Sequence, residues 1–223
     1  MREQKPVALV IGASRGLGRA IAVELARADV HVVAVARSTS GLEKCDDLIQ
    51  AATGKKATLL SFDLLNHDQL AQLPLSLAQR FGRLDYFIHT AAELGALTPT
   101  QSIGKDMWQK VMQVNVGSVV ELLEGLLPLM QVQKTPGRIC LFDDPSTCPA
   151  RPYWGAYAAS KAALRALAQS LQAELKGNSV TLNLISPPAM PTKLRSCAFP
   201  GEDISKLCSP EEVARGLITQ IIL

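Results

Sequence analysis

The sequence predicts a doubly wound α/β fold, in which helices cover both faces of one parallel β-sheet. Short apolar runs rich in valine and isoleucine alternate with longer amphipathic stretches, as in repeated βαβ units. Glycines cluster directly after the first apolar run, where a buried strand would turn into a helix. Together these observations predict a three-layer αβα arrangement with the sheet in the middle.

Six short runs are apolar and β-branched enough to form strands that are buried on both faces. They occupy residues 6–11, 30–36, 57–62, 84–89, 138–142 and 179–185. The segments between them are long enough to be helical crossovers. This rhythm predicts six parallel strands joined by helices.

Three of the connecting segments are clear helix candidates, at residues 16–28, 105–133 and 154–175. Residues 187–210, in contrast, are rich in proline and show neither helical nor strand periodicity. Unstructured stretches of this length in a compact domain usually cover a ligand. We therefore expect residues 187–210 to form a loop over the substrate.

The composition indicates a single domain over residues 1–223. Of these residues 48% are apolar, and the net charge of +3 comes without a long basic run, which argues against nucleic acid as a partner. The five cysteines form no C-x-x-C pair and the three histidines are far apart, so neither disulfides nor a metal site are indicated. The first strand follows the N-terminus too closely for a signal peptide or a membrane span, so we expect a cytoplasmic protein without a membrane partner.

Residues 12–18, which we call the glycine loop, read Gly-Ala-Ser-Arg-Gly-Leu-Gly between the first strand and the first helix. Without side chains at Gly12, Gly16 and Gly18, the backbone can approach a pyrophosphate that lies at the helix N-terminus. Strand-to-helix turns also need glycine for conformational reasons alone, which is the alternative explanation. The placement between a buried strand and an amphipathic helix favours a dinucleotide site.

The end of the second predicted strand distinguishes between the two nicotinamide dinucleotides. An NAD(H) site places an acidic residue there for the ribose 2′-hydroxyl, whereas this sequence has Ala36 followed by Arg37. Arg37 can pair with a 2′-phosphate, and Arg15 of the glycine loop can reach the same group from the other side. The sequence therefore favours NADP(H) over NAD(H), although both arginines could simply be solvated.

Tyr157 and Lys161 form a Y-x-x-x-K pair, four residues apart in a predicted helix. Together with the glycine loop, this pair resembles the short-chain dehydrogenase/reductase family, and the likeness extends over essentially the whole chain. Within that family, the sequence is most similar to the YciK-like bacterial oxidoreductases in three stretches, at residues 111–115, 154–161 and 195–200. The resemblance implies a Rossmann fold and NADP(H)-dependent oxidation or reduction of a small alcohol or carbonyl compound.

The chemistry of the pair follows from its spacing, because residues four apart share one face of a helix. A lysine ammonium about 4 Å from a phenol stabilises the phenolate by about 4 kcal/mol at an effective dielectric constant near 20. This is enough to lower the pKa of Tyr157 by about three units from about 10. Tyr157 would then serve as general acid or base. The resemblance implies that Lys161 also holds the nicotinamide ribose and that Asn115 shapes its helix for a water-mediated proton relay; Asn115 alone could simply mark a helix kink.

The same resemblance implies further contacts to the cofactor. Asp63 and Leu64 correspond to a pair that contacts adenine, and Thr192 to a hydroxyl residue near the nicotinamide amide. Without the resemblance, these residues could be a strand-end cap and a loop hydroxyl. The complete set of expected cofactor contacts comprises Gly12, Ser14, Arg15, Gly16, Leu17, Gly18, Arg37, Ser38, Asp63, Leu64, Ala91, Tyr157, Lys161 and Thr192.

Asp144 is the most consequential departure from the family, which has a serine thirteen residues before its tyrosine. An ionised carboxylate accepts hydrogen bonds and donates none, so it cannot stabilise an oxyanion. At about 4 Å from Tyr157, it would raise the pKa of the phenol about as much as Lys161 lowers it. Three remedies are open: Asp144 is protonated, Ser146 or Thr147 takes its place, or the reaction needs no such donor.

Three other departures lie near the same end of the expected site. Thr90 replaces an asparagine that braces the sheet, Ala92 adds a methyl group beside the cofactor path, and Pro188 replaces a flexible glycine. The sequence therefore supports two functions. The first is an NADP(H)-dependent oxidoreductase of a small carbonyl or alcohol, and the alternative is a catalytically impaired dinucleotide-binding or scaffold protein.

The sequence ends soon after the helix predicted from Ser209, where the family usually continues into a seventh strand. That strand belongs to a surface through which such proteins often form tetramers. We therefore expect a sheet of six strands and a homodimer or a monomer.

Overall fold

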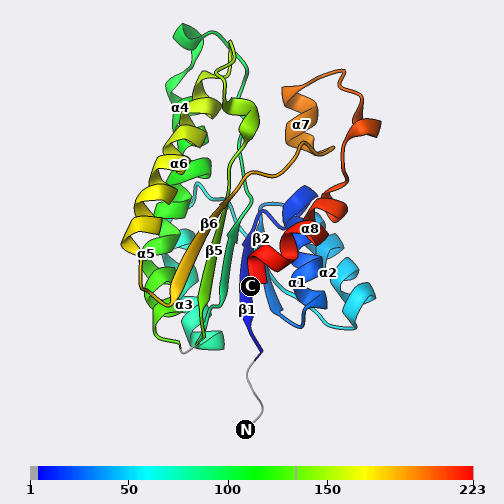
Figure 1. Cartoon of the computed structure of the whole chain (residues 1–223), viewed down its shortest axis with the longest axis vertical. Coiled ribbons are helices and arrows are strands. Elements are labelled where there is room, and N and C mark those ends of the chain that lie inside the picture. Colours follow the sequence, from blue (N-terminus) through cyan, green and yellow to red (C-terminus); the bar gives the residue numbers. More distant parts are fainter. Residues whose placement is uncertain (1–4, 134, 223) are drawn as a thin grey trace.

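The structure, a computed structural model, describes residues 5–133 and 135–222 of the chain. Six parallel strands form one sheet between two layers of helices (Figure 1). The strands are β1 Val7–Ile11, β2 His31–Ala36, β3 Thr58–Ser61, β4 Tyr86–His89, β5 Gly137–Phe142 and β6 Val180–Ile185. The expected strands agree with these bounds within two residues at each end. The predicted doubly wound fold is therefore confirmed.

The order of the strands across the sheet, β3-β2-β1-β4-β5-β6, reverses direction beside β1. The chain first winds outward from β1 to β3, then returns to β4 on the other side of β1. Connections on the two sides of such a switch point diverge and leave a crevice beyond the carboxyl ends of the strands. The glycine loop follows β1 directly and so lies at this crevice.

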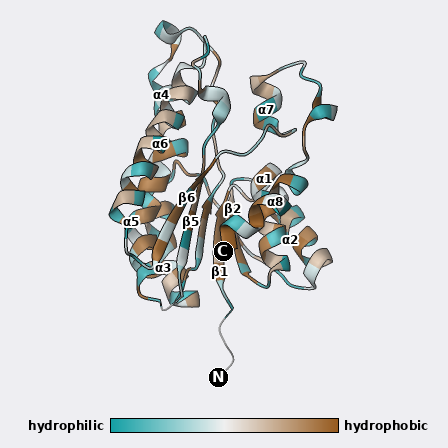
Figure 2. Ribbon diagram, in the orientation of Figure 1, coloured by the Kyte–Doolittle hydropathy of each residue, from teal (hydrophilic) through white to brown (hydrophobic). Residues whose placement is uncertain are grey.

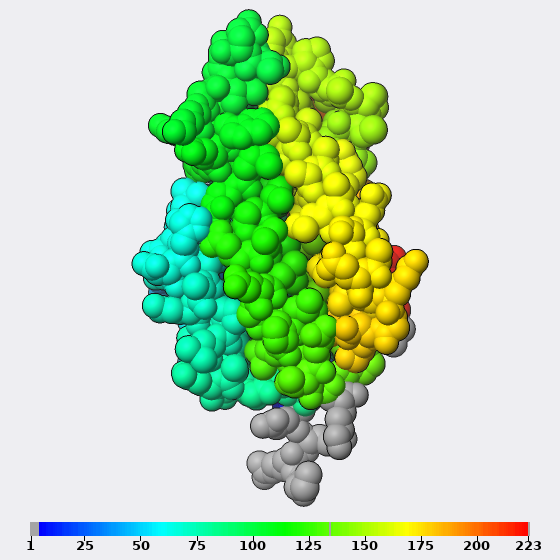
Figure 3. All heavy atoms as spheres, turned by 90° about the vertical axis from the view of Figure 1, so that its left-hand side faces the viewer, coloured from blue at the N-terminus to red at the C-terminus, as the bar shows by residue number. Residues whose placement is uncertain are grey.

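Helices cover the two faces of the sheet in separate layers (Figure 1). One layer consists of α1 Gly16–Arg27, α2 Thr39–Thr53 and α8 Pro210–Ile222. The other consists of α3 His67–Phe81, α4 Lys105–Met112, α5 Ser118–Gln131 and α6 Gly155–Glu174. Figure 3 shows α3, α5 and α6 side by side on the outside of this second layer. A short helix, α7 Lys193–Ala198, lies beyond the carboxyl ends of the strands.

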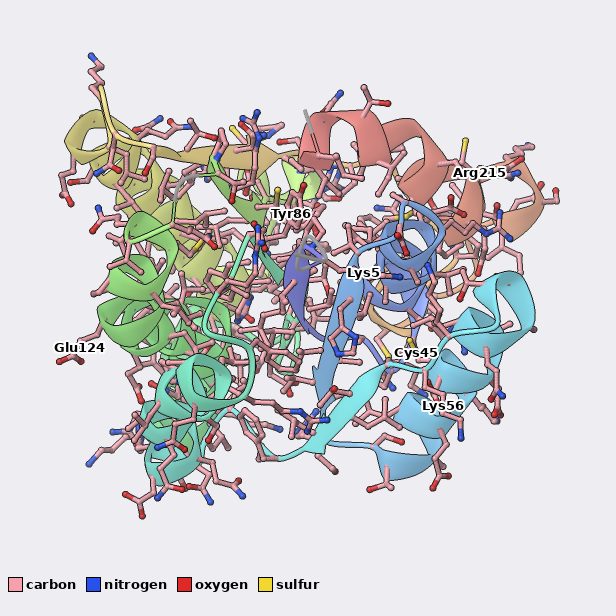
Figure 4. The ribbon with its side chains drawn as sticks, turned by 90° about the horizontal axis from the view of Figure 1, so that it is seen from below. Lys5, Cys45, Lys56, Tyr86, Glu124 and Arg215 are labelled. Carbon is pink, nitrogen blue, oxygen red and sulfur yellow. The ribbon has the colours of Figure 1, made fainter. Side chains whose placement is uncertain are left out.

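The two layers bury alternate residues of the same strands. In β1, Leu9 and Ile11 pack with the helices of the second layer, whereas Ala8 and Val10 pack with those of the first. This follows from the two-residue period of a strand. The apolar sides of the helices face the sheet (Figure 2), and from below Glu124 of α5 points away from it (Figure 4). In the part of the chain described, no helix is long and apolar enough to cross a membrane.

The single helix expected over residues 105–133 is wrong, because a π-helical turn at Gln113–Gly117 separates α4 from α5. The side chain of Asn115 lies inside this turn and bonds to neighbouring segments, as described below. The apolar residues before and after the turn still face the core, so their periodicity alone does not reveal the interruption.

The loop expected over residues 187–210 also needs correction. It contains α7 and a 3₁₀ turn at Ile204–Lys206. Thr192 begins α7, and its side-chain oxygen accepts a hydrogen bond from the backbone N–H of Arg195 at 3.2 Å. A helix of six residues is too short to show a periodic pattern among prolines.

Gly18→Ala and Gly216→Ala provide a matched test of the close packing of α1, because both glycines lie within helices. A β-carbon at Gly18 would overlap Thr90 Oγ1 and the carbonyl oxygen of Gly12, whereas one at Gly216 would meet no atom within 4 Å. We expect Gly18→Ala to lower the free energy of unfolding by about 1–3 kcal/mol. Gly216→Ala should raise it by about 0.5–1 kcal/mol, because alanine favours the helix. Urea denaturation measures both, and an equal gain in the two variants would contradict the packing described.

Candidate functional site

A cavity of about 840 Å³ occupies the crevice at the switch point. Its walls come from the glycine loop, from the ends of β2 to β5, from α6 and from the segment that leads into α7. The cavity brings together the expected site residues Gly12, Ser14, Arg15, Gly16, Leu17, Gly18, Arg37, Ser38, Asp63, Leu64, Ala91, Asp144, Tyr157, Lys161 and Thr192. Asn115, the remaining expected residue, is 1% exposed and lies behind the wall.

The glycine loop adopts conformations that require glycine at two positions. Gly12 has a φ of +90° and Gly16 a φ of +55°, both in the region that side chains disfavour. A β-carbon on Gly12 would lie 2.8 Å from the backbone nitrogen of Ala91, so the loop approaches the backbone just beyond the end of β4 too closely for a side chain. The amide groups of the first turn of α1 therefore lie at the cavity, with no acidic side chain in that turn.

Thr90 keeps the bracing role that the sequence comparison with the family put in doubt. Its hydroxyl donates a hydrogen bond to the carbonyl oxygen of Ile11 at 2.8 Å, which ties the end of β4 to the end of β1. Thr90 also packs against the positions of Gly12 and Gly18. The threonine therefore substitutes for the expected asparagine rather than loosening the sheet.

Basic side chains mark the end of the cavity beside β2, which we call the Arg37 end. Arg37 Nη1 lies 3.6 Å from Asp63 Oδ2, and both side chains are more than 40% exposed, at 53% and 41%. An exposed ion pair of this kind contributes less than about 1 kcal/mol, so an incoming phosphate can replace Asp63 as the partner of Arg37. Arg15 is exposed at the same cavity. Arg19 of α1 also lines it, and its buried Nε has no hydrogen-bond partner among the described residues.

These features fit the phosphates of NADP(H). Glycines leave room for a pyrophosphate at the start of α1, and guanidinium groups that can pair with a further phosphate line the same cavity. Ser38 caps α2 by accepting a hydrogen bond from the backbone N–H of Gly41 at 3.1 Å. Leu64, 7% exposed, supplies an apolar wall. Arg19 was not identified from the sequence, since its position within a helical pattern gave no sign of its side chain's partners.

At the opposite end of the cavity, the Tyr157 end, helix α6 presents Tyr157 and Lys161 one turn apart. Tyr157 is 2% exposed, and its hydroxyl donates a hydrogen bond to Asp144 Oδ2 at 2.9 Å. Asp144 Oδ1 accepts a second bond from the backbone N–H of Ser146 at 2.8 Å. The carboxylate that replaces the family serine thus contacts the tyrosine directly.

The electrostatic balance expected at Tyr157 is wrong. Burial, followed by the negative charge of Asp144 and the hydrogen bond to it, raises the pKa of Tyr157 far above its usual value of 10.0. Lys161 makes no hydrogen bond to the phenol, since its ammonium donates instead to the carbonyl oxygen of Phe142 at 2.7 Å. That ammonium lies 5.8 Å from the centre of the Tyr157 ring. Burial also lowers the pKa of Lys161 to about 8, although Asp144 and Asp143 act in the opposite direction.

Asn115, which is buried outside the cavity, links α6 to the segment after β4. Its Oδ1 accepts from the backbone N–H of Glu93 at 2.7 Å, and its Nδ2 donates to the Glu93 carbonyl oxygen at 3.0 Å and to Ser160 Oγ at 2.8 Å. Ser160 Oγ in turn donates to the carbonyl oxygen of Tyr157 at 2.7 Å. The π-helical turn places the amide of Asn115 between these two segments. The proton relay expected at Asn115 stays a prediction.

Two ion pairs near the Tyr157 end were not identified from the sequence. Arg165 Nη1 lies 2.9 Å from Asp143 Oδ1 and also donates to Thr147 Oγ1 at 3.1 Å. Thr147 is 5% exposed, and its hydroxyl donates to the carbonyl oxygen of Asp144. Thr147 is therefore already engaged and is not free to replace the family serine. The sequence held no sign of this arrangement, because it depends on how the segment after β5 folds back onto α6.

The second of these ion pairs lies on the loop that contains α7. Arg195 is bonded through two nitrogens to Glu202, at 2.7 and 2.5 Å, and its guanidinium lies 3.6 Å from the centre of the Phe199 ring. Its Nη1 donates to Ser146 Oγ at 3.2 Å, which links the loop to the segment after β5. The side chain of Ser146 thus points to Arg195, while its backbone holds Asp144.

Known proteins are similar to this chain over most of its length. A family model described as short chain dehydrogenase matches residues 6–203. YciK of Escherichia coli strain K12, an uncharacterized oxidoreductase, is 34% identical over 209 residues, which cover 93% of this chain and 82% of YciK.

Solved structures are similar over the same length. The structure of E. coli YciK has a TM-score of 0.87 at 33% identity and covers 97% of this chain and 87% of that one. A short chain dehydrogenase from Shigella flexneri, complexed with NADP, has a TM-score of 0.90 at 31% identity and covers 100% and 93%. Another from E. coli CFT073, complexed with NADPH, has a TM-score of 0.90 at 32% identity and covers 97% and 90%. The chain therefore belongs to the short chain dehydrogenase family.

Proposed function

We propose that the protein is an NADP(H)-dependent oxidoreductase that moves a hydride between the cofactor and a small molecule. The observation that carries the proposal is one cavity that joins the glycine loop and Arg37 at one end to Tyr157 and Lys161 at the other. Two structural relatives were solved with NADP and with NADPH, which supports the choice of cofactor.

The residues of this chain would divide the work along the cavity. Arg37 and Arg15 would hold the 2′-phosphate, and the first turn of α1 would hold the pyrophosphate. Lys161 would bind ribose hydroxyls with the ammonium that now bonds to Phe142. Once bound, the nicotinamide would supply or accept the hydride, and Tyr157 would contact the reacting group of the substrate.

The carbonyl or alcohol expected from the sequence as reacting group stays a prediction, and one observation stands against it. In carbonyl reduction, Tyr157 has to give its proton to the substrate oxygen, yet its hydroxyl is already donated to Asp144. The same hydrogen bond favours the alternative of a dinucleotide-binding protein without catalysis. Tight NADPH binding without oxidation of NADPH by any substrate would establish that alternative.

Arg37→Ala tests the cofactor. We expect the Kd for NADPH to rise by about tenfold or more, because a charge-assisted contact to the 2′-phosphate is lost. The Kd for NADH should change little, since NADH lacks that phosphate. Isothermal titration calorimetry measures both, with Arg27→Ala on the outer part of α1 as the control. Equal losses for the two cofactors would contradict the assignment of Arg37.

Lys161→Met tests whether the Tyr157 end is catalytic. We expect kcat/KM to fall by about a hundredfold or more, because the variant keeps the length of the side chain and loses the ammonium. Lys176→Met, at an exposed position beyond the end of α6, should retain full activity. The assay follows loss of NADPH absorbance with aldehydes, ketones and imines. Unchanged turnover in Lys161→Met would exclude the proposed role.

Asp144→Asn tests the electrostatic origin of the raised pKa of Tyr157. Asparagine has nearly the same shape but no charge, so the phenolate becomes less unfavourable and the pKa of Tyr157 should fall. Ultraviolet titration of tyrosinate measures the change, and the same titration of Tyr157→Phe identifies which of the tyrosines is observed. An unchanged titration would mean that burial alone raises the pKa.

A further inference from the structure

Asp144 brings a negative charge to the Tyr157 end that no cation neutralises directly. The carboxylate lines the cavity, half-buried, and accepts hydrogen bonds from the Tyr157 hydroxyl at 2.9 Å and from the backbone N–H of Ser146 at 2.8 Å. Over residues 5–133 and 135–222, no lysine, arginine or histidine nitrogen lies within ion-pair distance of it. A partly buried carboxylate of this kind is a site for a cation.

The charged side chains around Asp144 are occupied elsewhere. Asp143 is paired with Arg165 at 2.9 Å, and Arg195 is paired with Glu202 at 2.5 Å. Each of these pairs is neutral as a unit. Lys161 of α6 and Arg195 of α7 interact with Asp144 over a longer distance, but neither forms an ion pair with it. The two carboxylate oxygens, which each accept one hydrogen bond, can therefore accept another from a donor in the cavity.

The distance between Asp144 and Tyr157 restricts which reacting group fits. An atom of the substrate that is hydrogen-bonded to the Tyr157 hydroxyl lies within about 6 Å of Asp144 Oδ2, two hydrogen-bond lengths away. Reduction of a carbonyl builds negative charge on this atom, and the carboxylate would oppose it. A protonated carbon–nitrogen double bond has the opposite character, because it brings a positive charge and an N–H donor to the carboxylate.

We propose, on the basis of the function proposed above, that the reacting group of the substrate is a C=N bond bound as its iminium ion, with its N–H donated to Asp144. Hydride from NADPH adds to the iminium carbon, and the electron pair of the C=N π bond becomes the lone pair of nitrogen. NADPH is oxidised to NADP⁺, and the iminium is reduced to a neutral amine. The amine then takes up a proton from water after release.

This assignment explains why Tyr157 can be held as a donor to Asp144. The step requires no proton from the protein, so the raised pKa of Tyr157 does not slow it. Tyr157 acts here as a positioning residue, which fixes Oδ2 while the backbone of Ser146 fixes Oδ1. The charge of Lys161 interacts with Asp144, but its ammonium donates to Phe142 and forms no ion pair with the carboxylate, so Asp144 can still accept the iminium N–H.

The first experiment measures binding without turnover. Pyrrolidine, a cation at neutral pH, and cyclopentanol, its neutral counterpart in size, are titrated by calorimetry into protein saturated with NADP⁺. We expect pyrrolidine to bind at least about tenfold more tightly than cyclopentanol, and Asp144→Asn to remove this preference. Asparagine can still accept the bond from Ser146 through Oδ1, so the loop keeps its anchor. Glu211→Gln, which removes an exposed carboxylate from the same cavity, should leave the preference unchanged.

The second experiment measures turnover with NADPH, using pyrroline and cyclopentanone as imine and ketone of the same ring size. The wild-type protein should have a kcat/KM for pyrroline at least about tenfold above that for cyclopentanone. Asp144→Ser, which installs a hydrogen-bond donor, should invert the order of the two substrates. The Kd of each variant for NADPH shows that it is folded.

Three results would overturn the assignment: amine binding that is unaffected by Asp144→Asn, a preference for cyclopentanone, or NADPH binding without reduction of pyrroline. The first two would leave the proposed function intact, and the third would favour the non-catalytic alternative. A protein that does not bind NADPH at all would instead overturn the proposed function and this assignment with it. The calorimetric titration with NADPH separates these cases before substrates are compared.

Discussion

The close approach of α1 to the carboxyl ends of β1 and β4 is the constraint on which the cavity depends. Gly18 leaves no space for a β-carbon between Gly12 and Thr90, and Thr90 is itself bonded to Ile11. The contact is made by backbone at Gly12 and by the side chain of Thr90, whose rotamer is fixed by its bond to Ile11. It holds the first turn of α1 at the switch point of the sheet, where amide groups and strand ends face the same space.

The two ends of this cavity differ in how firmly their charges are held. At the Arg37 end, the pair with Asp63 is exposed and contributes less than about 1 kcal/mol, so the guanidinium is free to change partners. At the Tyr157 end, the bond to Asp144 is partly buried and involves a charged acceptor, worth about 1.5–3 kcal/mol. A cofactor phosphate can therefore replace Asp63 as the partner of Arg37 at little cost in free energy. A substrate at the Tyr157 end, in contrast, has either to displace the Tyr157 hydroxyl from Asp144 or to donate a further hydrogen bond to Asp144.

The fold could be predicted because strands buried on both faces leave continuous apolar runs, and the Y-x-x-x-K spacing is preserved by any straight helix. The sequence indicated a shaped or kinked helix at Asn115, but not the contact that its side chain makes from the π-helical turn to Glu93, distant in sequence. The same limit applies to Tyr157. Its pKa depends on its burial and on Asp144, which the segment after β5 brings into contact with the hydroxyl, and neither the burial nor this contact is encoded in local periodicity.

A carboxylate in place of the family serine places a negative charge at the Tyr157 end, while the fold around it is retained. Asp144 does not disturb the loop, because Oδ1 accepts the backbone N–H of Ser146 as a turn residue ordinarily would. Oδ2 then faces Tyr157 and the cavity. The residues that would hold a hydride donor and acceptor together are thus different from the residue that sets the charge beside the acceptor. Under the proposed assignment, this one side chain would redirect the same scaffold from groups that become negative to groups that begin positive.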